Sequence, residues 1–174
     1  MRKKLKKRNK MIGVALVIIV LLFGIITVKF IQYEKIIEDT ERTWLITQYG
    51  PRDVNSMFYT LYGGKGQLIV VDGGWTEDAD FVRQTIKEMG GKVDAWILTH
   101  PHQDHIGAFN AIYSDLQGIE IKKVYTVDMP SPKLCQERAH WDSVDTYNDF
   151  LDLNVKNLRY VYPGDELNIC GLKV

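Results

Sequence analysis

The sequence predicts an α/β domain over residues 44–174, preceded by an N-terminal transmembrane helix. Two observations lead to this fold class. From Trp44 onward, short runs rich in β-branched and aromatic residues alternate with segments of helical periodicity, which is typical of helices layered over a mixed sheet. Ahead of this region lies a long apolar run without a charged residue. The length of 174 residues fits one domain with short extensions.

The N-terminal charge pattern points to a membrane. Residues 1–10 carry seven Lys/Arg and no acid, whereas residues 11–174 have a net charge of −7. Residues 11–28 contain no charge, and Thr27 is their only polar side chain. As a helix this run spans about 27 Å, which is close to the thickness of a bilayer's hydrocarbon core.

We therefore expect a basic cytoplasmic tail at 1–10, a single-pass signal anchor in the cell membrane at 11–31 and a stalk at 32–43. The cations hold the N-terminus in the cytoplasm, so the domain at 44–174 is expected to be extracytoplasmic. A cleaved signal peptide is the alternative, but the apolar run is long for one and no A-x-A pattern follows it.

The domain is expected to begin with three strands, Trp44–Tyr49, Ser56–Tyr62 and Gln67–Val71, separated by turn residues. Gly63–Gly66, "GGKG", is a hairpin turn in this scheme. It is not a phosphate-binding loop, because it lacks the Walker spacing and a strand follows it rather than a helix.

The remaining elements alternate between helix and strand. A helix is expected over residues 76–91, with Thr76 as its N-cap, an apolar stripe at Ala79, Val82, Ile86 and Met89, and Gly90 at its end. The later elements are listed in chain order: a strand at Val93–Leu98, a helix at 106–116, a strand at Ile121–Val127, a helical segment or irregular lid at 132–153, and a hairpin over 158–174. Cys135 and Cys170 are either a disulfide or two separate thiols.

The candidate functional residues lie directly after the expected strand at Val93–Leu98. His100, His102, Asp104 and His105 fall within six residues, "HPHQDH", and include three of the four histidines of the chain. Loops at the carboxyl ends of strands are where open α/β sheets bind ligands. Imidazole and carboxylate ligands without a nearby thiolate favour zinc, with manganese or iron as alternatives.

This hexad resembles the H-x-H-x-D-H signature of the metallo-β-lactamase superfamily of hydrolases. A second match is "LIVV" followed by "DGG" at Asp72–Gly74, which is similar to the aspartate turn of that family. The likeness runs from about Trp44 to Val174. Within the superfamily, "THPHQDHIG" and "PGDELNICGLKV" are most similar in wording to the DNA-uptake, competence-protein-like branch.

The resemblance implies an αββα sandwich with a two-metal site along one edge. It assigns His100 and His102 to a first Zn²⁺, and Asp104 and His105 to a second. It also implies a catalytic role for Asp104, next to the attacking water, and a supporting role for Asp72, which would brace the metal ligands by hydrogen bonds. The expected activity is hydrolysis of an ester or phosphodiester, with no serine or cysteine nucleophile.

The family pattern also requires a further histidine, an aspartate and a last histidine downstream, and here the only later histidine is His140. We therefore expect the sequence to be the first half of the sandwich, truncated at its C-terminus and inactive alone. His140 is expected at the surface, with a metal or lid role as alternatives. The rival functions are a DNA-uptake or nuclease module, which the charge of −7 disfavours, and a metal-binding domain without turnover.

Overall fold

The structure is a computed structural model that describes residues 16, 18–35, 43–50 and 57–174. The chain separates into two units, Met1–Thr43 and Trp44–Val174. In the first unit, residues 18–35 form a helix with exposed side chains. The whole basic tail, residues 11–15 and 17 of the expected anchor, and residues 36–42 of the stalk lie outside the described residues. Among the residues that are described, no helix combines the length and apolar character needed to cross a membrane.

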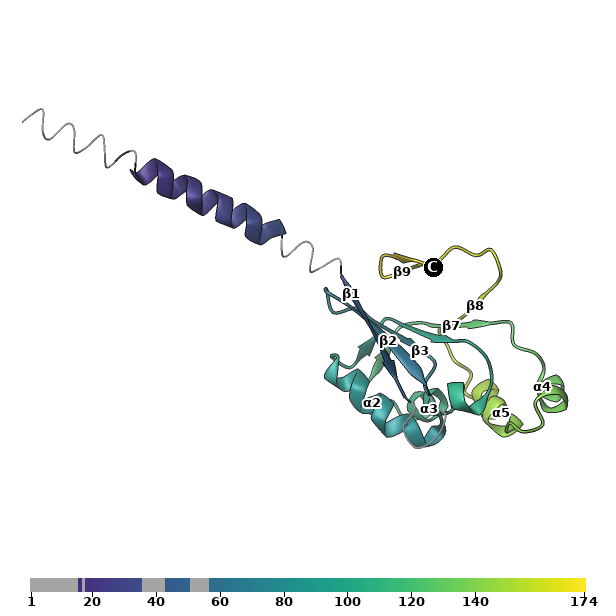
Figure 1. The fold of residues 1–174 in the computed structure, drawn as a ribbon. Coiled ribbons are helices and arrows are strands. Elements are labelled where there is room, and N and C mark those ends of the chain that lie inside the picture. Colours follow the sequence, from purple (N-terminus) through teal and green to yellow (C-terminus); the bar gives the residue numbers. More distant parts are fainter. Residues whose placement is uncertain (1–15, 17, 36–42, 51–56) are drawn as a thin grey trace, which may run out of the picture. The chain divides into compact units, whose positions relative to one another are not determined.

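The second unit is built on a mixed sheet, as predicted (Figure 1). In the described part of the chain this sheet has six strands in the order β1-β2-β3-β5-β7-β8. Their bounds are β1 (Trp44–Tyr49), β2 (Phe58–Gly63), β3 (Leu68–Val71), β5 (Ala95–Leu98), β7 (Val124–Val127) and β8 (Leu158–Val161). The first three are antiparallel neighbours, with the expected tight turn at Gly63–Gly66 between β2 and β3, and β3, β5, β7 and β8 run parallel.

Two expected strands are each divided in the structure. Val93–Leu98 becomes β4 (Lys92–Val93) and β5, and Ile121–Val127 becomes β6 (Glu120–Ile121) and β7. The break falls at Asp94, whose carboxylate accepts hydrogen bonds from Leu68 N and from the Lys122 ammonium. Because this side chain replaces a ladder partner, β4 leaves the main sheet and pairs with β6 in a small sheet of its own.

The expected hairpin over 158–174 is wrong. Its first strand, β8, joins the edge of the main sheet beside β7. The hairpin lies entirely within the last residues, where β9 (Asn168–Ile169) pairs with β10 (Leu172–Lys173). Gly171 and Cys170 form its turn, both with positive φ. A two-residue turn with positive φ matches strand twist in a hairpin, so the "ICGL" stretch reverses the chain on its own.

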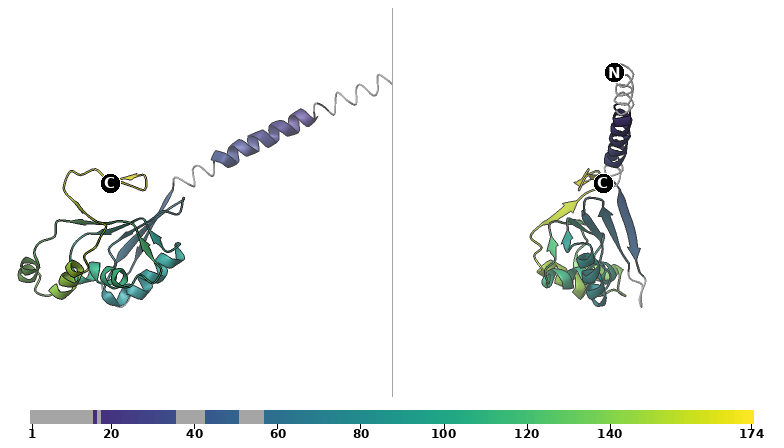
Figure 2. Two further views of the ribbon diagram at one scale, coloured as in Figure 1. Left: turned by 180° about the vertical axis from the view of Figure 1, so that it is seen from behind. Right: turned by 90° about the vertical axis from the view of Figure 1, so that its left-hand side faces the viewer.

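Helices cover one face of the main sheet (Figures 1 and 2). They are listed in chain order: the 3₁₀-helix η1 (Thr76–Asp78), α2 (Ala79–Glu88), α3 (Gln103–Ser114), α4 (Pro132–Arg138) and α5 (Val144–Asp152). The N-cap of η1 is Trp75, not Thr76. The helix expected at 106–116 begins three residues earlier, at Gln103. The stretch at 132–153 is helical, in two pieces.

Two apolar clusters hold the unit together. The larger one lies between the sheet and its helices and centres on side chains with essentially no exposure, among them Trp96, Phe109, Ile86 and Ile106. The smaller one lies on the opposite face, where Leu167 and Ile169 of the C-terminal hairpin pack with Ile69, Ala95 and Tyr125. Cys135 packs against the larger cluster and Cys170 against the smaller, and both thiols are free, so they form no disulfide.

Gly107 fixes how closely α3 approaches η1. A Cβ at this position would lie 2.5 Å from the backbone nitrogen of Thr76 and 2.9 Å from the carbonyl carbon of Trp75. Gly107→Ala should therefore lower the free energy of unfolding by about 1–3 kcal/mol, as overpacking against backbone does. Chemical denaturation measures this loss. Gly24→Ala is the matched control, because a Cβ there meets nothing within 4 Å. Equal stability of the Gly107 variant and the wild type would contradict this packing.

Candidate metal centre

The candidate site lies at the carboxyl ends of two neighbouring parallel strands. β3 and β5 are paired in register, with Val71 opposite Ile97. Asp72 follows β3, and Thr99 follows β5. A few residues further on, the chain turns into α3, so that Asp104 and His105 lie in the first turn of a helix and His102 is its N-cap. The topology thus brings the aspartate turn and the hexad together.

The Asp72 backbone is held in an unusual conformation. Its φ is 57°, in the left-handed region that aspartate tolerates better than most residues. Its N–H donates to Ile97 O at 2.8 Å, and its carbonyl accepts from the indole Nε1 of buried Trp96 at 2.9 Å. The residue is only 5% exposed. These bonds hold the Asp72 carboxylate toward the hexad.

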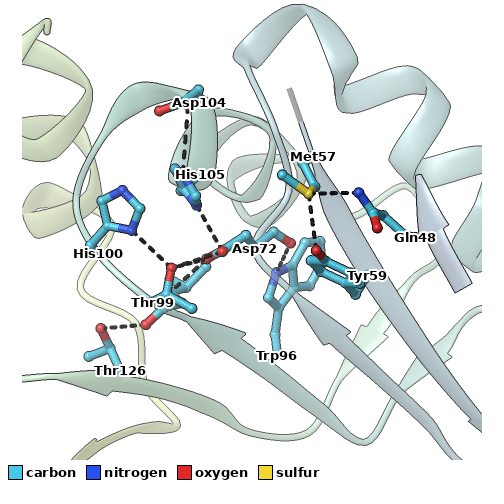
Figure 3. Close-up of polar contacts among 11 residues, drawn as sticks. Gln48, Met57, Tyr59, Asp72, Trp96, Thr99, His100, Asp104, His105 and Thr126 are labelled. Atoms are coloured by element: carbon cyan, nitrogen blue, oxygen red, sulfur yellow. Dashed lines mark hydrogen bonds and ion pairs between the residues drawn. The ribbon is translucent and has the colours of Figure 1, made fainter. Parts of the chain in front are cut away.

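The Asp72 carboxylate is the centre of a hydrogen-bond network (Figure 3). It accepts from Thr99 N at 2.9 Å, from the Thr99 hydroxyl at 2.8 Å, and from His105 Nδ1 at 2.8 Å. The Thr99 hydroxyl has one proton, and it donates that proton in its hydrogen bond to the carboxylate. The Thr99 oxygen, 3.0 Å from His100 Nδ1, is therefore the acceptor for that ring nitrogen.

This network fixes the orientation of two imidazoles. Because His100 and His105 both donate through Nδ1, the neutral rings carry their lone pairs on Nε2. The ring centroids of these two histidines are 3.7 Å apart, and those of His100 and His102 are 4.7 Å apart. His105 Nε2 lies 3.6 Å from the Asp104 carboxylate. All four hexad side chains are half-buried, so they meet both the protein interior and solvent.

The surroundings shift the pKa values of His105 and His100 in opposite directions. For His105, burial acts to lower the pKa, but the hydrogen bond to Asp72 and the charges of Asp72 and Asp104 outweigh it and raise the pKa above the ordinary 6.5. For His100, burial and the neighbouring His105 and His102 lower the pKa. A His100 ring that sheds its proton readily is suited to bind a cation at neutral pH.

The donor set fits zinc in its chemistry. Three imidazoles and a carboxylate converge at one edge, and two of the imidazoles are oriented from behind by hydrogen bonds of the kind that metal-ligating histidines make. Over the described ranges, however, no group of three or more His, Cys, Asp or Glu side chains is already arranged to hold an ion. The residues that would hold the metal are thus gathered but not closed into a coordination shell.

The raised pKa of His105 predicts how the metal-free protein responds to pH. The protonated His105 ring pairs with Asp72 in the folded state. The contribution of this pair to stability is therefore full below about pH 6.5, the ordinary pKa of histidine, and is lost as the pH rises through the folded-state pKa. The unfolding free energy of wild type minus that of His105→Asn should therefore fall as the pH rises above about 6.5, with a chelator present. Urea titrations measure it, and His140→Asn serves as a control. A difference that grows with pH would contradict this assignment.

Two residues at or beside the site were not among the sequence candidates. Thr99 directly precedes the hexad and links Asp72 to His100; its position between strand and motif was the available signal. Asp142 lies in the α4–α5 connection, and its carboxylate accepts from Gln103 N at 3.3 Å, at the N-terminus of α3. Nothing local in the sequence marks it. His140, two residues away, is exposed and contacts Trp141, as expected of a surface residue.

Comparison with known proteins places this geometry in a family. Residues 49–164 match the metallo-beta-lactamase superfamily. Hydroxyacylglutathione hydrolase of Aliivibrio fischeri (strain MJ11) is 29% identical over 121 residues, which cover 67% of this chain and 46% of that protein. The enzyme of the same name from Photobacterium profundum is 28% identical over 131 residues, which cover 73% of this chain and 50% of that protein. The chain thus spans about half the length of these relatives.

Among solved structures, a metallo-beta-lactamase from Staphylococcus aureus subsp. aureus COL aligns with a TM-score of 0.44 and 12% identity, over 76% of this chain and 33% of that one. The family match extends from the last residue of β1 to beyond β8 and therefore includes Asp72 and the whole hexad. The chain belongs to the metallo-beta-lactamase superfamily.

Proposed function

We propose that this protein is a metal-dependent hydrolase that directs water onto an acyl ester, with zinc as the metal and two ions in the complete site. One observation carries the proposal: a single buried carboxylate, Asp72, orients two imidazoles of the hexad, directly at His105 and through Thr99 at His100. Membership of a hydrolase superfamily and similarity to hydroxyacylglutathione hydrolases support it.

Each residue of the hexad has a separate role in this proposal. His100 and His102 hold the first zinc, and Asp104 and His105 hold the second. When bound, zinc would supply a water of lowered pKa and polarise the carbonyl oxygen of the acyl group. Asp104 accepts a hydrogen bond from the attacking water and so orients it. Asp72 and Thr99 touch no substrate; they hold the rings of His105 and His100 in one tautomer.

The substrate class follows from the relatives and from charge. The name of the relatives says that they hydrolyse hydroxyacylglutathione, so we propose an acyl bond as the one cleaved here. A phosphodiester, as expected for a DNA-uptake or nuclease module, is the competing substrate. The charge of −7 over residues 11–174 disfavours it, because nucleic-acid backbones bind Lys/Arg surfaces.

Hydrolysis assays test the proposal. The protein with its complete site, loaded with zinc, should cleave an aryl ester or an acyl-glutathione faster than a bis-aryl phosphate, and Asp104→Asn should abolish that activity. Faster cleavage of the phosphate would favour the nuclease assignment. Stoichiometric zinc binding with no turnover of any of the three substrates would favour a binding domain.

We further propose that residues 11–31 anchor the protein in the cell membrane, with the N-terminus cytoplasmic and residues 44–174 extracytoplasmic. The support is the charge-free run at 11–28 behind seven cations. The protein should stay in the membrane fraction after alkaline carbonate extraction and be digested by protease added to spheroplasts. Release by carbonate, or protection from the protease, would contradict the anchor or its orientation respectively.

A further inference from the structure

The helix that carries two of the proposed metal ligands has no cap from its own N-cap residue. α3 begins at Gln103, with Asp104 and His105 in its first turn, and its N-cap is His102, whose side chain makes no capping hydrogen bond. Most helices use Ser, Thr, Asp or Asn here, because a side-chain oxygen can accept from the first backbone N–H groups. The proposed function gives the His102 ring to a metal, so α3 needs an acceptor from elsewhere.

Asp142 supplies this acceptor. Its Oδ1 accepts from Gln103 N, the first N–H of α3, at 3.3 Å and across 39 positions of the chain. The next donors of the turn are satisfied locally, since His105 N and Ile106 N both donate to His102 O, at 3.0 and 3.1 Å. A carboxylate is also well suited to this place, because the N-terminal end of a helix carries partial positive charge.

The segment that carries Asp142 is fastened to α3 at a second level. Asp142 N donates to Ala139 O at 2.9 Å, which closes a turn after α4. Shortly beyond, Thr146 O in the first turn of α5 accepts from Nδ2 of buried Asn110 at 2.8 Å. Asn110 lies about two turns along α3 from Gln103. The α4–α5 connection is therefore held against α3, with the Asp142 carboxylate at the end of the helix.

The Asp142 carboxylate also acts on the hexad through space. Burial acts to lower the pKa of His105, and the carboxylates of Asp72, Asp104 and Asp142 raise it. Asp142 is half-buried, so solvent does not fully screen its charge. The carboxylate therefore lies beside the turn that bears the proposed ligands, as its contact with the Gln103 backbone requires.

We propose that Asp142 is a positioning residue of the metal centre: it caps α3 in place of His102 and so fixes the turn that presents Asp104 and His105 to the metal. Asp142 is not a ligand here, because it acts through the Gln103 N–H. The inference rests on the proposed function in one respect, the assignment of the hexad as metal ligands. Since coupling between two sites is reciprocal, zinc at the hexad should also hold the bond between Asp142 and Gln103 closed.

Zinc affinity tests the role of this bond. Asp142→Ala should lower the affinity of the 174-residue protein about 3- to 10-fold, less than the 10- to 100-fold expected for a residue that touches a ligand. Gln103→Pro should have a similar effect, because it removes the donor alone. Proline fits the first position of a helix, and His102 before it has the extended backbone that proline requires, with φ −69° and ψ 147°.

Combining the two changes shows whether they act through one contact. The loss of zinc affinity in the double variant should be about that of either single variant, well below the product of the two. Asp142→Asn keeps an acceptor oxygen and should stay within about twofold of wild type. Asp145→Ala, which removes an exposed acid from the first turn of α5, is the matched control and should leave the affinity unchanged.

Three results would overturn the proposal. These are wild-type zinc affinity in Asp142→Ala, losses that multiply in the double variant, and an Asp142→Asn variant as weak as Asp142→Ala. The first would show that Asp142 has no role at the centre. The second would show that it acts by a route other than the Gln103 N–H, and the third that its charge alone matters.

Amide hydrogen exchange separates this proposal from that of the hydrolase. The first N–H of a helix has no acceptor within the helix, so protection of the Gln103 amide in the metal-free protein should depend on Asp142 and fall about 5-fold in Asp142→Ala. The Ile106 amide, bonded to His102 O, is the internal reference. Zinc should slow Gln103 exchange further in the wild type.

The two proposals then fail in different ways. An unprotected Gln103 amide in a wild-type protein that binds zinc at the hexad would refute the role of Asp142 and leave the metal centre intact. A Gln103 amide protected through Asp142, in a protein that binds no zinc, would refute the ligand assignment and the positioning role with it.

Discussion

Replacing His100 or His102 with alanine should lower the affinity of the protein for zinc by about 100-fold or more. Loss of residues that merely support a metal ligand costs about 10- to 100-fold, and loss of a ligand costs no less. The His100 and His102 rings are close neighbours at 4.7 Å between centroids, so each variant removes one of the donors proposed to share an ion. Competition titration against a chromogenic zinc chelator measures the affinity directly, without an assay of activity.

His140→Ala is the matched control for this experiment. It removes an imidazole of the same chemistry from an exposed position, where the ring packs against Trp141. We expect its zinc affinity to stay within about twofold of wild type. If His140→Ala and His102→Ala lowered the affinity equally, zinc would be bound by scattered surface histidines, and the assignment of the hexad would fail.

Asp72→Ala should lower the free energy of unfolding by about 3 kcal/mol, for two reasons that separate experimentally. The substitution leaves the Thr99 N–H, the Thr99 hydroxyl and the His105 ring without their shared acceptor, at a cost of about 1–3 kcal/mol. It also forces alanine into a left-handed backbone conformation, at about 1 kcal/mol or slightly more. The same variant should lower zinc affinity about 10- to 100-fold, because His105 and His100 lose their orientation.

Asp72→Asn separates the effect of losing the carboxylate from the effect of backbone strain. Asparagine tolerates the left-handed region and keeps one acceptor oxygen, so we expect about half the loss of stability seen with alanine. Urea denaturation with a chelator present measures both variants free of any contribution from bound metal. Equal stability of wild type and Asp72→Ala would show that the network is not structural, and the proposed orienting role would then be abandoned.

The sequence indicated the mixed sheet, the strand before the hexad and the aspartate turn, because each depends on local patterns. The buried run Ala95–Leu98 and the hexad that follows it are adjacent in the chain, and the resemblance supplied Asp72 as their partner. It could not supply Thr99, whose hydroxyl serves as a relay only because β3 and β5 end side by side.

The predictions from sequence failed where a contact distant in the chain overrode a local pattern. Asp94 interrupts an apolar strand because its carboxylate takes the place of a ladder partner for Leu68. Asp142 reaches Gln103 from 39 positions away, so no local pattern marks it as a cap. At the C-terminus, β8 was assigned to a hairpin, but its partner is the parallel strand β7, distant in sequence. Long-range contacts of this kind are what periodicity in a single sequence does not report.

The way in which the C-terminal hairpin is attached affects amide hydrogen exchange and aggregation. Among the described strands, β9 and β10 pair with each other and with none of the main sheet, so side-chain packing, chiefly of Leu167 and Ile169, attaches them to it. An element attached in this way opens without breaking the main ladder, so its amides should exchange with solvent long before those of β3 and β5. Each opening uncovers the apolar sheet face at Ile69 and Tyr125, where neighbouring molecules can adhere. Self-association should therefore follow the rate of this local opening rather than that of global unfolding.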